Sequence, residues 1–214
     1  MPRLQILILA AGFSSRLGRP KALARVRSVS LLRRTLLLAT QLSPARIMVV
    51  IPHRAARYRV EAHGLNVLFV ANPLRADGLS SSVRLGIARG RYSPALLLLP
   101  VDLAAARRCE LARLISRWRG TPRRVVARRI GRHDRTSQTP HDGAPQGGVP
   151  LILPRRLYPR ALAVTGDIGL RELVNGLPAE ERVLVDLPSA ELDVDTPQDL
   201  HAARRGRRGF ATSP

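Results

Sequence analysis

Two cationic side chains stand in a loop of small residues near the start of the chain. Residues 7–23 read LILAAGFSSRLGRPKAL, so an apolar run leads into glycine and serine residues that are followed by Arg16 and Lys21. Small residues let backbone N–H groups approach an anion closely, and such loops commonly wrap phosphate oxygens. Arg16 and Lys21 would add the positive charge that a triphosphate needs. The loop therefore favours a phosphate site.

The loop matches neither G-x-x-x-x-G-K-[ST] nor G-x-G-x-x-G, so it is neither an ordinary P-loop nor a dinucleotide fingerprint. A strand followed by a Gly/Ser turn also occurs in α/β proteins that bind no phosphate at that point. Lys21 is, however, the only lysine among 36 basic residues. An arginine-rich chain that has its single ammonium group in this loop favours the phosphate interpretation.

Asp102 directly follows residues 95–101, the most apolar run of the chain. A carboxylate just past the carboxyl end of a central parallel strand lies where α/β sheets bind ligands. Hard oxygen ligands suit Mg²⁺, so Asp102 is a candidate magnesium ligand. The alternative is an N-cap for the helix expected over residues 108–118.

More aspartates occur in the segment ELDVDTPQDL, residues 191–200. Asp195 or Thr196 can cap a helix that begins at Pro197. Local structure leaves Asp193 unexplained.

A third polar cluster is the serine run at residues 80–82, which follows Gly78 and starts a helical pattern. We expect at least one hydroxyl to cap the N–H groups of that helix. The alternative is that the remaining hydroxyls and the helix N-terminus face a nucleotide.

Apolar runs that alternate with helical patterns must position these groups. They argue for β-α-β crossovers and a parallel sheet covered on both faces, an α/β fold. The expected strands are residues 4–9, 46–51, 67–71, 95–101, 123–127, 149–153 and 183–187, and the main helices are 30–42, 54–62, 108–118, 154–163 and 170–175.

The composition restricts the class of protein. With 214 residues, 45% of them hydrophobic, the chain can form one α/β domain. No apolar segment approaches the roughly 20 residues needed to span a bilayer, and we read the N-terminal apolar run as the first strand rather than a signal peptide. The lone Cys109 excludes an internal disulfide and agrees with a cytoplasmic protein.

The formal net charge of +21 favours polyanionic partners. The arginines are nevertheless scattered, without aromatic interleaving or a recognisable nucleic-acid module, so we expect no specific nucleic-acid partner.

Several polar segments receive structural interpretations. We expect residues 131–148 to form a mobile loop, with His133 and His141 solvated, and Asp167 to be a cap or turn residue. The domain is expected to span residues 1–202, and the basic residues 203–214 to form a disordered tail.

Five blocks of the chain, taken in order, resemble the MobA-like nucleotidyltransferases, most closely those of the molybdenum cofactor cytidylyltransferase type. The blocks are LAAGFSSRLGRPKAL, NPLRADGLSSSVRLGI, LLLLPVDL, GGVPLIL with GDIGLREL, and DVDTPQDL, and together they run from residue 9 to residue 200. The resemblance implies a single Rossmann-like nucleotidyltransferase domain of three layers with a mostly parallel central sheet.

The resemblance also implies residue roles. Lys21 would lie near the α-phosphate, Asp102 would hold Mg²⁺, and either Asp193 or Asp195 would be the second metal ligand. Gly78 and Ser82 match positions that contact base and ribose. The residues assigned to nucleotide binding are Ala10, Ala11, Gly12, Phe13, Arg16, Lys21, Gly78 and Ser82.

The implied reaction is Mg²⁺-dependent transfer of CMP from CTP to the terminal phosphate of molybdopterin, with release of pyrophosphate; Ala11 in LAAG favours CTP over GTP. The alternatives are guanylyl transfer, nucleotidyl transfer to another phosphorylated acceptor such as a sugar phosphate, or a non-catalytic accessory protein that loads cofactor into a molybdenum hydroxylase apoenzyme. The chain departs from the family pattern where Asp102-Leu103-Ala104 replaces Asp-x-Pro, and before Pro150, where many relatives have a polar residue.

Overall fold

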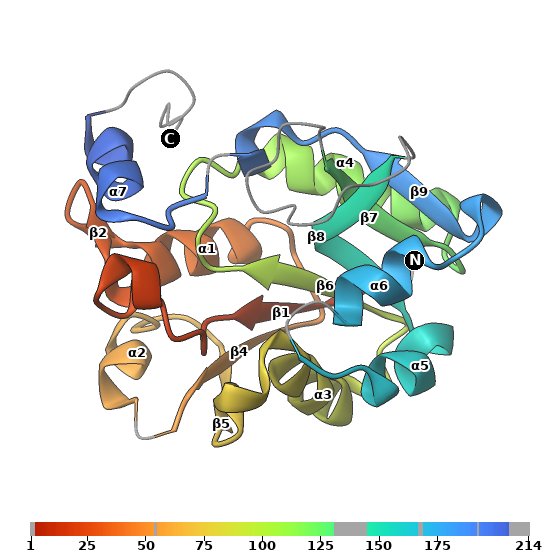
Figure 1. Ribbon diagram of the computed structural model, residues 1–214, viewed down its shortest axis with the longest axis horizontal. Coiled ribbons are helices and arrows are strands. Elements are labelled where there is room, and N and C mark those ends of the chain that lie inside the picture. Colours follow the sequence, from red (N-terminus) through yellow and green to blue (C-terminus); the bar gives the residue numbers. More distant parts are fainter. Residues whose placement is uncertain (1–2, 54, 131–144, 167–168, 192, 206–214) are drawn as a thin grey trace.

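The computed structural model describes residues 3–53, 55–130, 145–166, 169–191 and 193–205. Within these residues, seven strands form a sheet in the order β5-β4-β1-β6-β8-β7-β9, with helices on both faces (Figure 1). The strands are β1 (Gln5–Leu9), β4 (Arg46–Pro52), β5 (Leu68–Asn72), β6 (Ala95–Pro100), β7 (Val125–Ile130), β8 (Gln146–Pro154) and β9 (Arg182–Val185).

The sheet is mostly parallel, which confirms the expected α/β architecture. β1 pairs in parallel with β4 and β6, β4 with β5, and β7 with β9. β8 is the exception, because it lies antiparallel between β6 and β7. The strand pattern alone did not predict this reversed strand.

Each central strand of the sheet contributes side chains to two hydrophobic cores, one on each face of the sheet. Ile6 and Ile8 of β1 pack on one face of the sheet, and Leu7 and Leu9 pack on the other. Successive side chains of a strand point to opposite faces, so a strand buried on both sides has a continuous apolar sequence. Helices α1 (Leu31–Thr40), α4 (Arg108–Gly120) and α7 (Pro197–Arg204) cover the first face, and α3 (Leu79–Gly90), α5 (Tyr158–Ala163) and α6 (Gly169–Asn175) cover the second.

The strand order reverses at β1, so the carboxyl ends of β1 and β6 lie side by side at one edge of the sheet. The chain passes from β1 to β4 and β5 on one side, and then returns to β6 on the other side of β1. Such a reversal in strand order opens the space in which α/β sheets bind ligands. The loop after β1 and Asp102 after β6 both begin at this edge.

Ser30 is the N-cap of α1. Its hydroxyl oxygen accepts a hydrogen bond from Arg33 N at 3.0 Å and donates to Glu61 Oε2 at 2.7 Å. Ser28 instead lies in the turn between β2 (Arg25–Val26) and β3 (Val29–Ser30), with a φ of 67°.

Helix α3 packs very closely on β1. A Cβ atom on Gly86 would collide with the side chain of Leu7, whose Cγ atom would be 2.9 Å away. Only glycine lets the helix approach the strand this closely.

Among the described helices, none has the length and apolar character to cross a membrane.

α7 ends at Arg204, and Ala203 is buried. His133, His141, Asp167 and residues 206–214 lie outside the described residues, so the expectations for them stay predictions.

Candidate active site

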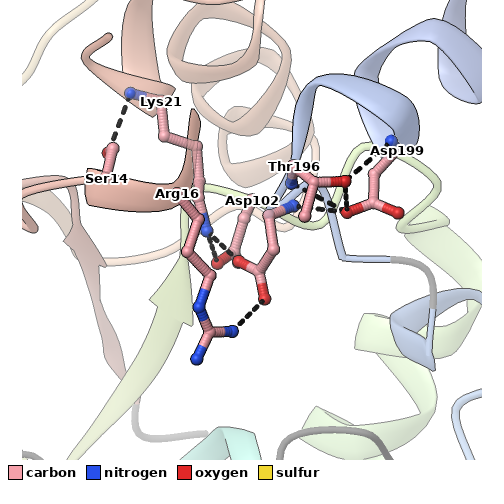
Figure 2. A network of polar contacts seen from close by, with 7 residues as sticks. Ser14, Arg16, Lys21, Asp102, Thr196 and Asp199 are labelled. Atoms are coloured by element: carbon pink, nitrogen blue, oxygen red, sulfur yellow. Dashed lines mark hydrogen bonds and ion pairs between the residues drawn. The ribbon is translucent and has the colours of Figure 1, made fainter. Parts of the chain in front are cut away.

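The loop after β1 is closed by a side chain of its own. Ser14 has a left-handed backbone with a φ of 56°, and its Oγ accepts a hydrogen bond from Lys21 N at 2.9 Å (Figure 2). Ala10 and Ala11 are buried at the end of the strand, whereas Gly12 is exposed. The loop thus turns away from the sheet with its backbone accessible, which suits an anion.

The ammonium group of Lys21 lies between two carboxylates. Its Nζ donates to Asp102 Oδ2 at 2.9 Å and to Asp195 Oδ1 at 2.5 Å (Figure 2). The side chain of Lys21 is 15% exposed, that of Asp102 23% and that of Asp195 30%. Three segments that are distant in the sequence therefore meet at one nitrogen atom.

The two carboxylates raise the pKa of Lys21. Burial by itself would lower this pKa, but the negative charge of Asp102, the hydrogen bonds to both aspartates and the charge of Asp195 outweigh it. Lys21 is therefore a protonated, positively charged group at neutral pH.

Arg16 is the solvent-exposed member of the cluster. Its Nη1 lies 3.9 Å from Asp195 Oδ2, and its side chain is 67% exposed. An exposed ion pair at this distance contributes little stability. The guanidinium group can therefore leave Asp195 and bind a phosphate ligand at little cost in stability.

A short bridge and a capping box hold the DVDTP segment in place. Leu103 pairs with Asp193 in an antiparallel bridge, and Val194 N donates to the carbonyl oxygen of Asp102 at 3.2 Å. Asp199 Oδ2 accepts hydrogen bonds from the backbone N–H groups of Asp195 at 3.1 Å and Thr196 at 2.8 Å.

Thr196 is the N-cap of α7, because its Oγ1 accepts from Asp199 N at 3.2 Å. This capping box fixes the backbone at Asp195, and the side chain of Asp195 points to Lys21. Sequence reasoning missed the role of Asp199; the spacing Thr-x-x-Asp before a helix is the signal that could have found it.

The geometry separates the two candidate partners of Asp102. Asp195 shares Lys21 with Asp102, whereas Asp193 lines a cavity that Asp102 also lines. In the part of the chain that the structure describes, no group of three or more His, Cys, Asp or Glu side chains could hold a metal ion. Asp102 and Asp195 are the carboxylates of this cluster that could hold a divalent ion, with phosphate and water oxygens completing its shell, as is common for Mg²⁺. The ammonium between the two carboxylates marks a position that suits a cation, so the residues fit a divalent ion.

The Gly78 turn is fixed by a buried polar network. Gly78 has a φ of 82° and a ψ of −171°, a conformation that disfavours any other residue. Asn72 Nδ2 donates to Ser81 Oγ at 2.8 Å and to Ser82 Oγ at 3.0 Å, and Asn72 Oδ1 accepts from Leu74 N. Asn72 holds the turn from the end of β5, a role that sequence reasoning missed.

The serine cluster does not cap α3, so that expectation was wrong. Ser81 Oγ donates to the carbonyl oxygen of Gly78 at 2.8 Å, and Ser80 Oγ donates to that of Asp77 at 3.3 Å. The serines lie inside the first turn of the helix, where their hydroxyls reach back to carbonyl groups.

Phe13 forms an exposed platform at the loop. Its side chain is 57% exposed, and the guanidinium carbon of Arg75 lies 4.2 Å from the centre of its ring. This cation–π contact connects the loop after β1 with the segment before Gly78.

The site brings together the loop after β1, two cationic side chains and two carboxylates. Residues 6–183 match the family described as "MobA-like NTP transferase domain", so the chain belongs to that family of enzymes. A protein of Rhodopirellula baltica named "Probable molybdenum cofactor guanylyltransferase" is 29% identical over 206 residues, 93% of this chain and 90% of that protein.

Solved structures show the same fold. Rv0371c from Mycobacterium tuberculosis is 24% identical and has a TM-score of 0.70, over 95% of this chain and 98% of that chain. The same protein in complex with manganese has a TM-score of 0.66 at 24% identity, over 94% and 96% of the two chains. A 2-C-methyl-D-erythritol 4-phosphate cytidylyltransferase from Thermus thermophilus has a TM-score of 0.65 at 21% identity, over 95% and 98% of the chains. Similarity at these identities establishes the fold alone.

Proposed function

We propose that this protein is a Mg²⁺-dependent cytidylyltransferase that transfers CMP from CTP to the terminal phosphate of molybdopterin. The observation that carries the proposal is the Lys21 ammonium between Asp102 and Asp195, directly beside the phosphate loop. Support for the acceptor comes from the family and from the name of the R. baltica relative.

The loop binds the triphosphate of the nucleotide. The backbone of residues 10–13 offers N–H groups, and Arg16 and Lys21 neutralise the phosphate charge. Lys21 exchanges its two carboxylates for phosphate oxygens near the α-phosphate, where charge develops during transfer. Asp102 and Asp195 would hold Mg²⁺, which would supply Lewis-acid polarisation of the phosphate oxygens.

The transfer needs no covalent nucleophile on the protein. An oxygen of the acceptor phosphate forms a bond to the α-phosphorus of CTP, and the bond from that phosphorus to the bridging oxygen of the β-phosphate breaks. Pyrophosphate leaves with the electron pair, and CMP remains joined to the acceptor. The residues of the site act by positioning and by charge stabilisation.

The base is recognised at the loop and at the Gly78 turn. We assign Ala11 to the preference for cytosine, and Gly78 and Ser82 to base and ribose. Ser82 is buried and bonded to Asn72, so it acts on the nucleotide through the shape of the turn. Guanylyl transfer is the second candidate, because the R. baltica relative is named a probable guanylyltransferase.

We further place the enzyme in the cytoplasm, with a molybdenum hydroxylase apoenzyme as the recipient of its product. Its partners are CTP and the phosphorylated pterin, without a specific nucleic acid. A role as a non-catalytic loading protein is the competing proposal.

The deciding experiment is a pyrophosphate-release assay with CTP, GTP, ATP and UTP, each with molybdopterin and Mg²⁺. We expect release with CTP that requires both acceptor and metal. If GTP is the only nucleotide that gives release, the proposed reaction becomes guanylyl transfer instead of cytidylyl transfer. An absence of release with every nucleotide would reject the enzymatic proposal, and a sugar phosphate panel tests the other class of acceptor.

A further inference from the structure

A cavity of about 150 Å³ lies directly beside Asp102, on the side away from the phosphate loop. Asp102 and Asp193 form part of its wall, and Arg128 and Arg171 form another part. Asp102 therefore belongs both to the cluster around Lys21 and to this cavity.

The charges of the cavity are arranged by strand order. The two aspartates come from the end of β6 and from the segment bridged to it at Leu103. Arg128 comes from β7 and Arg171 from α6, and β8 separates β7 from β6 in the sheet. The cavity thus has an acidic side toward the phosphate loop and a basic side away from it.

Arg128 is held rigidly in the wall. It is only 5% exposed, and its Nη1 donates a hydrogen bond to the carbonyl oxygen of Ala190. A guanidinium group keeps its charge when buried, and its planar set of donors matches phosphate oxygens. Arg171 is only partly buried, so its side chain can adjust to an incoming group.

The proposed reaction brings two anions together, because a phosphate must approach a triphosphate. Arg16 and Lys21 serve the donor, and they lie on the loop side of Asp102. The acceptor needs cations of its own on the opposite side, since attack and departure occur roughly in line. The volume of the cavity suits the phosphate-bearing end of an acceptor rather than a whole pterin.

We infer that Arg128 and Arg171 bind the attacking phosphate of the acceptor in this cavity. This inference rests on the proposed function, because it requires an acceptor that carries a phosphate group. The phosphate would lie between the arginines and Asp102, with one oxygen toward the α-phosphorus of the nucleotide. In the transfer, that oxygen forms the new bond, and the pyrophosphate leaves on the loop side.

The kinetic test compares Arg171→Met with Arg119→Met, which removes the same charge from the exposed far end of α4. We expect Arg171→Met to raise the KM for molybdopterin about 10- to 100-fold, because a charge-assisted hydrogen bond to phosphate is lost. The KM for the nucleotide should be unchanged, and Arg119→Met should match the wild type. Arg128→Lys keeps the charge without the planar donors and should raise the acceptor KM in the same way.

A binding measurement separates this inference from the identity of the acceptor. Inorganic phosphate is titrated into Arg16→Met, in which the donor loop is weakened, and into the double variant Arg16→Met/Arg171→Met. We expect the double variant to bind phosphate at least about tenfold more weakly. Equal phosphate affinities would overturn the cavity assignment, even if the enzyme transfers CMP to molybdopterin. Weaker phosphate binding without any pyrophosphate release would support the cavity and reject the proposed reaction.

Discussion

Lys21 Nζ lies 2.9 Å from Asp102 Oδ2, although the two residues are 81 positions apart in the chain. The pair joins the loop after β1 to the carboxyl end of β6, the neighbouring strand. The parallel pairing of these two strands is what brings a cation and a carboxylate to one point.

Replacement of Asp102 by asparagine should reduce kcat about 100-fold or more, because a neutral amide cannot supply the charge of a metal ligand. The side chain keeps its shape, so the folded structure should persist. Pyrophosphate release and thermal unfolding measure the two effects. Asp186→Asn is the matched control, since that side chain is 73% exposed. An unchanged rate in Asp102→Asn would remove Asp102 from the metal site.

Asp195 and Asp193 should respond differently to substitution. Asp195 shares the Lys21 ammonium with Asp102, so Asp195→Asn should raise the Mg²⁺ concentration for half-maximal activity about tenfold or more. Asp193→Asn should leave this concentration close to that of the wild type. A magnesium titration of both variants measures the difference, and the reverse order would make Asp193 the metal ligand.

The ion pairs of Lys21 should stabilise the fold up to alkaline pH. The pKa of Lys21 is raised above its ordinary value of 10.5, so the folded state retains this proton more firmly than the unfolded state. The contribution is fully present below the unfolded pKa and is lost as pH rises through the folded pKa. Lys21→Arg keeps its charge at high pH. The free energy of unfolding of the wild type should therefore fall relative to Lys21→Arg above about pH 10.5, as measured by urea denaturation. A constant difference across this range would contradict the assignment.

The buried amide of Asn72 should control both stability and nucleotide affinity. Asn72→Ala leaves Ser81 and Ser82 without their donor, and should lower the free energy of unfolding by about 1–3 kcal/mol. The KM for the nucleotide should rise while kcat is largely retained, because the Gly78 turn shifts and Asp102 does not. Asn66→Ala, at an exposed position, should change neither quantity. A wild-type KM in a destabilised Asn72→Ala would confine the network to a structural role.

Gly86 should tolerate no larger residue. Gly86→Ala places a methyl group against Leu7, and should lower the free energy of unfolding by about 1–3 kcal/mol. Gly120→Ala is the control, because no atom lies within 4 Å of an added Cβ there. Chemical denaturation of both variants measures the effect. If Gly86→Ala has the same free energy of unfolding as the wild type, α3 can move away from β1 without a loss of stability, and the prediction is wrong.

Local sequence patterns predicted most elements of the fold because these elements depend on short-range properties. The apolar run of β1 and the serine before α1 follow from burial on both faces and from helix capping. The direction of β8 depends on its pairing with β6 and β7, which no local pattern encodes. The first-turn hydroxyls of α3 were assigned to capping, but those of Ser80 and Ser81 donate to carbonyl groups three residues earlier. Residue type alone does not distinguish these two local hydrogen-bonding patterns of serine.

The sequence by itself determined the chemical groups of the site, namely a small-residue loop with Arg16 and Lys21 and an aspartate at the end of an apolar strand. These follow from residue type and from neighbours along the chain. Only the tertiary structure decided that Asp195 shares Lys21 with Asp102 and that Arg128 lies in a cavity next to that carboxylate. Such relationships depend on strand order and on contacts between distant segments, and hydrophobic periodicity does not specify them.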